Sequence, residues 1–193
     1  MSEEVRAFFD SVSEKWDGWS KDDLSIIRKL FQPIQIQKGD LVLDVACGTG
    51  VVTGLLHELS QAPVTGIDIS PKMIDVAKRK YQGQEGIDFL SGDFLQFEGG
   101  RFDVIVIYNA YPHFLEPEQL CSALKKHLNP GGKFAIIHSL SREKLRSHHG
   151  PLGPRISRDL EAPEAEFQHF AKSFDLIAAY EDDDCYYLIS KLS

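Results

Sequence analysis

Short apolar runs alternate with segments of helical hydrophobic period along the chain from residue 40 onward. The apolar runs cover residues 41–46, 64–68, 87–90, 102–108 and 133–138. Residues 104–107 are continuously apolar and β-branched, as expected of a central strand that is covered on both faces. Strands that alternate with helices are typical of a parallel sheet. The pattern therefore predicts an α/β fold.

Turn and cap residues mark where some of these elements begin and end. Ser70 is placed to cap a helix that starts at Pro71, because serine is a favoured N-cap and proline fits the first helical position. Residues 129–132 read Asn-Pro-Gly-Gly and predict a tight turn before the fifth strand. Near the end of the chain, residues 175–180 and 185–190 flank three aspartates and predict a hairpin.

Two segments stand outside the alternating pattern. Residues 1–35 predict an N-terminal helical cap with several aromatic side chains, and residues 139–160 predict an irregular, lid-like insertion within a domain that covers residues 36–193. Ligands of open α/β sheets bind beyond the carboxyl ends of the strands. Segments that cover that edge often select the substrate, so we expect both to act as lids.

A glycine-rich turn follows the first predicted strand. Residues 44–50 read Asp-Val-Ala-Cys-Gly-Thr-Gly, and their glycines allow a sharp turn that brings bare backbone close to a ligand. The helix that follows directs free amide groups toward the same place. This motif alone indicates only nucleotide-type binding, and Thr53 stands where a dinucleotide-binding fingerprint has its third glycine.

The order of the next features is more specific. Asp68 ends the second predicted strand, where a carboxylate can accept hydrogen bonds from ribose hydroxyls. A Gly-Asp pair at residues 92–93 ends the third strand, Asn109 follows the fourth, and residues 129–132 precede the fifth.

With these five motifs in this order, residues 36–193 resemble the class I S-adenosylmethionine-dependent methyltransferases. The resemblance implies a Rossmann-like, doubly wound, mostly parallel seven-stranded sheet that ends in the antiparallel hairpin. It also implies an enzyme that uses S-adenosylmethionine and leaves S-adenosylhomocysteine. The reaction implied is in-line displacement at the methyl carbon, on a small-molecule acceptor whose methylated atom stays open. Such a reaction requires neither a metal nor a protein nucleophile.

The same resemblance implies a set of cofactor-binding residues. In it, Asp44 orients the methionine amino group, Asp68 holds the ribose, and Asn109 offers a backbone carbonyl. Asp68 also has an alternative role at the start of the Pro71 helix, and Met73 could be an ordinary core residue. The full set is Asp44, Ala46, Gly48, Gly50, Asp68, Ile69, Met73, Asp93, Phe94 and Asn109.

His113 is the candidate general base. It follows the fourth strand, where the methyl group would face the acceptor, and a histidine can take a proton near neutral pH. A structural histidine in a proline-containing turn is the alternative. Candidates for the substrate side are Trp16, Trp19, Tyr111, His138 and His148, for which ordinary packing is the alternative. The histidines match no recognised metal-binding spacing, so no metal is predicted.

The composition of the chain indicates which classes of binding partner are expected. The net charge of −8 disfavours nucleic acid, whose phosphates need a basic surface. The sequence shows no secretory pattern and no long apolar run, so we expect a cytoplasmic protein without a membrane partner, as a monomer or homodimer. The three cysteines are far apart, which predicts no disulfide framework, and Cys47 is interpreted as structural.

Other functions stay open at this point. A protein that binds S-adenosylmethionine without transferring its methyl group would carry the same binding motifs. A protein or tRNA methyltransferase would need an extended acceptor groove. An NAD-dependent oxidoreductase predicts a glycine at position 53 and a Tyr-x-x-x-Lys motif, and the sequence has neither.

Overall fold

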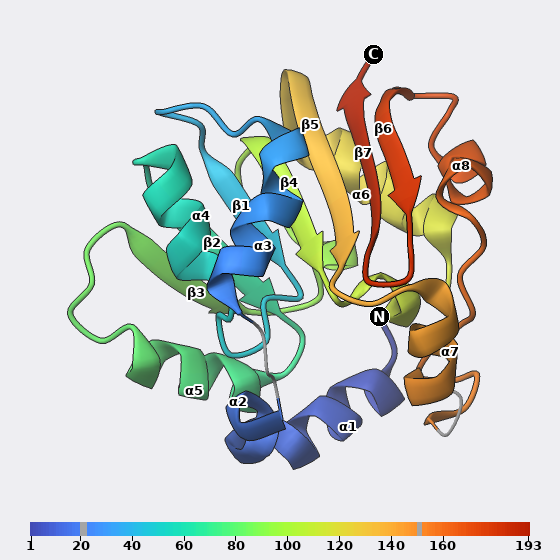
Figure 1. Cartoon of the computed structure of the whole chain (residues 1–193). Helices are drawn as coiled ribbons and strands as arrows, with labels where there is room; N and C mark the ends of the chain where they lie inside the picture. The colour runs from blue at the N-terminus through green and yellow to red at the C-terminus, as the bar shows by residue number, and fades with distance from the viewer. Residues whose placement is uncertain (20–22, 150–151) are drawn as a thin grey trace.

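The computed structural model describes residues 1–19, 23–149 and 152–193. A seven-stranded sheet in the order β3-β2-β1-β4-β5-β7-β6 forms its centre (Figure 1). The first five strands are parallel, and β7 and β6 add an antiparallel hairpin beside β5. The strands are β1 Val42–Val45, β2 Val64–Asp68, β3 Ile87–Ser91, β4 Phe102–Tyr108, β5 Leu128–His138, β6 Phe174–Glu181 and β7 Tyr186–Leu192. The predicted fold class is confirmed.

Helices cover both faces of the sheet. The α-helices are α1 Glu3–Val12, α2 Trp16–Trp19, α3 Leu24–Phe31, α4 Thr53–Ser60, α5 Pro71–Lys80, α6 Pro117–His127, α7 Arg142–His149 and α8 Pro163–Glu166. Strand β4 divides two apolar cores, because alternate side chains of a strand point to opposite faces. Val104 and Val106 pack with α3 and α4, whereas Ile105 and Ile107 pack with α6. This double burial explains the uninterrupted apolar run.

Tight packing fixes the turn between β1 and α4. A Cβ atom on Gly66 of β2 would lie 2.7 Å from the Phe89 ring and 2.9 Å from Cys47 Sγ, so only glycine fits there without displacement. Cys47 is buried in this contact, and burial raises the pKa of its thiol well above the usual value. The structure therefore supports a packing role for Cys47, because a neutral buried thiol is a poor nucleophile.

The helices of the N-terminal segment pack against two different parts of the molecule. Helices α1 and α2 lie across the carboxyl ends of the strands, whereas α3 packs on the face of the sheet (Figure 1). Helix α1 is joined to the start of α5 by Asp10, which accepts a hydrogen bond of 2.6 Å from Ser70 Oγ. Asp17 accepts one of 2.5 Å from Thr49 and forms a 2.7 Å ion pair with Lys80.

Two local predictions differ from the structure. Strand β5 begins at Leu128 rather than at residue 133 and takes in the predicted turn, with a register irregularity against β4 and a left-handed Gly131. The predicted irregular insertion contains α7, which is anchored by the buried side chain of Leu145. None of the helices in the described part of the chain has the length and apolar composition needed to cross a membrane.

Candidate functional site

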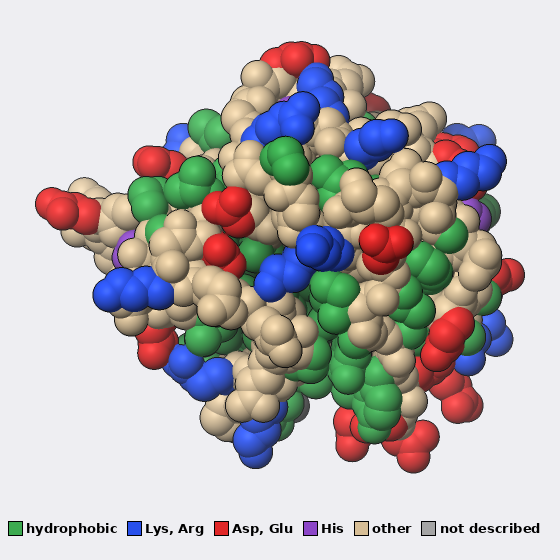
Figure 2. Space-filling view, turned by 90° about the horizontal axis from the view of Figure 1, so that it is seen from above, with side chains coloured by type: hydrophobic (Ala, Val, Ile, Leu, Met, Phe, Trp, Pro, Cys, Tyr) green, Lys and Arg blue, Asp and Glu red, His purple; other side chains and the backbone are tan. Residues whose placement is uncertain are grey.

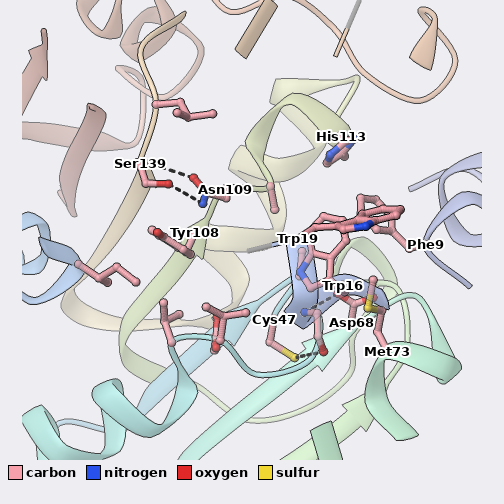
Figure 3. A pocket seen from close by; sticks show the side chains of 18 of the residues that line it. Phe9, Trp16, Trp19, Cys47, Asp68, Met73, Tyr108, Asn109, His113 and Ser139 are labelled. Carbon is pink, nitrogen blue, oxygen red and sulfur yellow. Dashed lines mark hydrogen bonds between the residues drawn. The ribbon is translucent and has the colours of Figure 1, made fainter. Parts of the chain in front are cut away.

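A cavity of about 690 Å³ opens at the carboxyl ends of the parallel strands, beneath the N-terminal helices. Its wall combines the loops after β1, β2, β4 and β5 with side chains of α1 to α3 and with three leucines of the 139–160 insertion, Leu140, Leu145 and Leu152. Figure 3 shows these groups converging from separate elements. This edge of an open α/β sheet is where ligands bind.

The glycine-rich loop shapes one end of the cavity. Gly48 and Gly50 have φ values of 54° and 77°, in the left-handed region that favours glycine. Ala46 adopts the same region with φ 54°, a conformation that costs an alanine about 1 kcal/mol. The amide of Gly48 donates a 2.8 Å hydrogen bond to Asp68 Oδ2, so the ends of β1 and β2 are tied together at the cavity.

Asp68 contacts the N-cap residue of α5 and also faces the cavity. Its Oδ1 accepts a 2.8 Å hydrogen bond from the amide of Ser70, and Ser70 in turn caps α5 by accepting from the amide of Met73. The Asp68 carboxyl also lines the cavity. Burial raises its pKa to about 6, although the amides of Ser70 and Gly48 act in the opposite direction. Each carboxylate oxygen has a second lone pair, so Asp68 can still accept from a ligand.

Asp44 is a second buried acid at the same end. Its side chain is 1% exposed, and Thr53 Oγ1 donates a 2.6 Å hydrogen bond to Oδ2. Burial raises the pKa of Asp44 to about 7; the Thr53 hydrogen bond lowers it and the charge of Asp68 raises it further. The threonine at position 53 therefore orients the acid of the first motif. Within residues 1–19, 23–149 and 152–193, neither acid forms a salt bridge.

Asn109 joins the ends of β4 and β5. It has a left-handed φ of 53°, which asparagine tolerates better than most residues. Its side-chain amide donates to Ser139 Oγ at 3.0 Å, and its Oδ1 accepts from the Ser139 amide at 2.9 Å. Both residues line the cavity, and this reciprocal pair places the Asn109 backbone carbonyl at a fixed position.

The cavity wall beneath the N-terminal helices is aromatic and largely apolar, and it reaches the glycine-rich loop, where a Cβ atom on Gly48 would lie 3.7 Å from Trp16 Nε1. Phe9 meets Trp16 and His113 edge to face, with ring centroids 5.5 Å and 5.0 Å apart. Trp16 and Trp19 both line the cavity, and Trp19 is 59% exposed. His113 is 4% exposed, and its Nδ1 lies 2.8 Å from the carbonyl oxygen of Ile156. In Figure 3 His113 lies above the group of rings formed by Phe9, Trp16 and Trp19.

Most of the sequence-predicted cofactor residues meet at the cavity, and three lie outside its lining. Asp44, Ala46, Gly48, Asp68, Ile69, Met73 and Asn109 line it. Gly50 lies in the same loop, where a Cβ atom would meet the rings of Tyr81 and Phe89. Asp93 caps a short helix through the amide of Leu95 at 3.0 Å and lies 2.5 Å from the amino group of Met1. Phe94 is buried in the core. The adenine-binding roles of Asp93 and Phe94 stay predictions.

Two candidates for the substrate side are elsewhere. Tyr111 is fully buried, and its hydroxyl donates a 2.7 Å hydrogen bond to Glu166. His138 is fully buried beside the ring of Tyr186. Neither residue lines the cavity, because each side chain points into the core at the end of its strand or turn. His148 belongs to α7, but its side chain is outside the described part of the structure.

The cavity also includes side chains that the sequence motifs do not reveal. Phe8 and Phe9 come from the apolar face of α1, and Leu140 and Leu145 come from the insertion after β5. In the sequence, the only signal for Phe8 and Phe9 is the aromatic content of the first predicted helix. The only signal for the leucines is that their segment directly follows a predicted strand. Among the described residues, no group of three or more histidine, cysteine, aspartate or glutamate side chains is arranged to hold a metal.

Comparison with known proteins agrees with this architecture. Residues 43–136 match the family described as "Methyltransferase domain". The demethylmenaquinone methyltransferase of Staphylococcus epidermidis is 33% identical over 148 residues, which cover 71% of this chain and 61% of that protein. The sterol 24-C-methyltransferase of Saccharomyces cerevisiae is 33% identical over 131 residues, 65% of this chain and 34% of that protein. The chain thus spans less than two thirds of either relative.

A solved structure shows the same fold over nearly the whole chain. The N-methyltransferase NodS of Bradyrhizobium japonicum, in complex with S-adenosylhomocysteine, superimposes with a TM-score of 0.77 at 18% identity. The match covers 98% of this chain and 99% of that one. Sheet order, motif order and family match together define a Rossmann-like methyltransferase domain. Residues 43–136 match a methyltransferase-domain family, and the fold is the one found in class I S-adenosylmethionine-dependent methyltransferases such as NodS, whose structure contains S-adenosylhomocysteine.

Proposed function

We propose that this protein transfers the methyl group of S-adenosylmethionine to a small, largely apolar acceptor molecule. One observation carries the proposal: a single cavity joins two buried acids, Asp44 and Asp68, to an aromatic chamber that contains His113. The first end suits the cofactor and the second suits an acceptor. A cavity of about 690 Å³ is within the range of small-molecule sites.

The chemistry of the acid end fits the cofactor. S-adenosylmethionine carries a sulfonium, an ammonium group and two ribose hydroxyls, all of which favour nearby carboxylates. Asp44 and Asp68 are buried without an ion pair among the described residues, so a cationic ligand would relieve the cost of their burial. We assign the ribose to Asp68 and the methionine amino group to Asp44 and the Asn109 carbonyl.

The lining of the other end indicates the class of acceptor. Phe8, Phe9, Trp16 and Leu145 give it aromatic and aliphatic surface, which favours a planar or lipid-like molecule over a charged one. Arg142 and Lys144, which could have bound an anionic acceptor, instead form ion pairs with Glu181 and Asp184. The named relatives methylate a demethylmenaquinone and a sterol, and both are acceptors of this character.

The chain itself supplies orientation, exclusion of water and a base. Bound S-adenosylmethionine supplies an electrophilic methyl group whose C–S bond breaks as the bond to the acceptor forms. Helices α1 and α2 and the 139–160 insertion act as lids that keep water from this chamber. His113 accepts the proton that the acceptor loses, which is typical of a histidine that works near neutral pH.

A methyl-transfer assay tests the proposal. The purified chain is incubated with S-adenosylmethionine carrying a labelled methyl group and with a panel of phenols, hydroquinones, amines and thiols of graded polarity. We expect labelled product and S-adenosylhomocysteine in equal amounts with an apolar aromatic acceptor. Binding of the cofactor with no transfer to any apolar acceptor would instead favour a non-catalytic binding protein, and transfer only to a polymer would overturn the small-molecule assignment.

A further inference from the structure

The hydrogen bond of His113 determines where its ring carries a proton. Nδ1 lies 2.8 Å from the carbonyl oxygen of Ile156, and a carbonyl oxygen can only accept a hydrogen bond. Nδ1 must therefore be the protonated nitrogen. A neutral imidazole has a single N–H group, so Nε2 then carries the lone pair that can take a proton.

The position of the Ile156 carbonyl depends on a turn rather than on a helix or strand. The amides of Ile156 and Ser157 both donate to the carbonyl oxygen of Gly153, at 3.1 Å and 3.2 Å. A short turn of this kind has few internal bonds, so contacts with the rest of the molecule must hold it against His113. Within the turn, Arg155 has two exposed contacts, a 3.3 Å hydrogen bond from Ser2 Oγ to its carbonyl and a 3.8 Å ion pair with Glu4. The half-buried contacts come from the residue that follows the turn, Arg158.

Arg158 forms hydrogen bonds with the residues on both sides of His113. Its backbone amide donates to the Pro112 carbonyl at 3.0 Å, and its Nε donates to the Phe114 carbonyl at 3.2 Å. The guanidinium also lies 4.6 Å from the ring centre of Tyr111, in a cation–π contact. The segment that carries Ile156 is therefore bound at three points to the short helix Tyr111–His113 and its C-cap residue Phe114.

Glu166 fixes the arginine in turn. Its two oxygens accept from the two terminal nitrogens of Arg158 at 2.8 Å each, which is the bidentate geometry. They also accept from the Tyr111 hydroxyl at 2.7 Å and the Glu161 amide at 2.8 Å. The Glu166 side chain is fully buried, so burial raises its pKa; hydrogen bonds from Arg158 and Glu161 nevertheless bring it below the usual value. The carboxylate is thus charged and fully bonded.

We propose that Arg158 and Glu166 are positioning residues that hold the Ile156 carbonyl against His113 Nδ1 and so keep Nε2 as the basic nitrogen. This inference rests on the proposed role of His113 as the base. Neither residue lines the cavity, so both act through His113 rather than on the acceptor. The 152–166 segment then has a function beyond covering the site, because it selects the tautomer.

The test must avoid leaving a buried charge unpaired. Replacing Arg158 alone would strand Glu166, a change that typically costs several kcal/mol, whereas replacing both members by apolar residues is often close to neutral. The variant is therefore Arg158→Met combined with Glu166→Met in the full chain. Arg146→Met is the matched control, because Arg146 forms an exposed 3.3 Å ion pair with Asp159 of the same segment.

Nitrogen chemical shifts of ¹⁵N-labelled histidine report the tautomer directly and need no acceptor. We expect a single Nδ1–H form of His113 in the native protein and in Arg146→Met. In the folded double variant we expect a mixture of both tautomers with at least a third as Nε2–H. If the double variant keeps the pure Nδ1–H form, or if the native protein lacks it, the inference is wrong.

Kinetics separate this inference from the proposed function. We expect kcat to fall at least tenfold in the double variant, while the cofactor Kd stays within twofold of native. An unchanged kcat despite a changed tautomer would overturn the link to catalysis. If the tautomer shifts as expected and the native protein methylates nothing, the proposed function fails while the positioning effect on His113 stands.

Discussion

The two ends of the cavity are lined by different kinds of chemical groups. At the cofactor end, strand termini, backbone amides and two buried acids create a polar surface that depends on β1, β2 and the loop between them. At the acceptor end, Phe9 of α1 contacts His113, and leucines of the 139–160 insertion add apolar surface to the wall of the cavity. Trp16 of α2 lies between the two ends, near Asp68 (Figure 3). In the proposed function, the first end recognises the cofactor by charge and hydrogen bonds. The second recognises an acceptor by shape and low polarity.

The difference extends to how each end is supported. Asp44 and Asp68 are fixed by hydrogen bonds within the sheet and its glycine loop. The acceptor end instead depends on contacts between distant parts of the chain, such as His113 with Ile156 and Phe9 with His113. Substitutions at the two ends should therefore separate cofactor affinity from turnover and from the choice of acceptor.

The largest effect is expected for His113→Ala. A general base contributes about 100-fold or more to the rate, so kcat should fall by about that factor, while cofactor affinity should change less than twofold. Steady-state kinetics with the identified acceptor, together with a cofactor titration, measure both. An unaltered rate would reduce His113 to a packing residue.

Asp68→Ala should produce the opposite pattern. Loss of hydrogen bonds from ribose hydroxyls to a charged group costs about 1.5–3 kcal/mol, so the cofactor Kd should rise about 10- to 100-fold. Equilibrium dialysis with labelled S-adenosylmethionine measures this. The control is Asp75→Ala, because Asp75 is an exposed aspartate of α5 outside the cavity. A folded Asp68→Ala with native affinity would remove this residue from the ribose site.

Asp44→Asn should stabilise the protein without cofactor while weakening cofactor binding. The folded-state pKa of about 7 lies above the usual value of 3.8. The buried carboxyl group therefore destabilises the fold least at low pH, where it is neutral. As the pH rises from about 4 to 7, its ionisation lowers the free energy of unfolding. At pH 8 the substitution should raise the free energy of unfolding by about 4 kcal/mol, at about 1.4 kcal/mol for each unit of pKa, and the gain should shrink as the pH falls toward 4. Denaturant titrations at several pH values check this; equal stability at all pH values would contradict a buried ionised Asp44.

The same acids predict a pH dependence of cofactor affinity. Burial raises the pKa of Asp68 to about 6 and of Asp44 to about 7, and a cationic ligand binds their ionised forms better. Affinity for S-adenosylmethionine should therefore rise between pH 5 and 8. A pH-independent Kd would indicate that neither acid faces the ligand charge.

The smallest effect is expected for the tryptophans of the cap. Trp16→Ala should raise the acceptor KM about fivefold through lost apolar contact and change the cofactor Kd less. Trp19→Ala should have a weaker effect, because the Trp19 side chain is 59% exposed. Parallel kinetics of the two variants compare an inner and an outer residue of the same helix. Equal KM values in both variants and the native protein would mean that α2 does not touch the acceptor.

Figure 2 shows the face of the molecule opposite the cap, where lysine and arginine side chains are interspersed with acidic and apolar ones. No continuous basic stripe is visible on this face, whereas nucleic-acid binding requires such a surface.

The sequence predicted that Asp44, Gly48 and Asp68 would lie together because they belong to short, local motifs, and all three line the cavity. Asp44, Gly48 and Asp68 each stand within a few residues of a strand end, and strand ends meet at one edge of a parallel sheet. The acceptor end was less predictable. Tyr111 lies only two residues before His113, yet its side chain points away from the cavity to Glu166. Neither that direction nor the Ile156 contact leaves a local pattern in the sequence, because both depend on tertiary packing.

Calorimetric titration of the native chain with S-adenosylmethionine and S-adenosylhomocysteine, with NAD as the control, tests the central claim most directly. The acids, the glycine loop and the cavity predict micromolar binding of both adenosyl ligands, with one molecule per chain and no binding of NAD. Failure of both adenosyl ligands to bind a demonstrably folded protein would contradict the account, and binding of NAD in their place would assign the glycine loop to a dinucleotide instead.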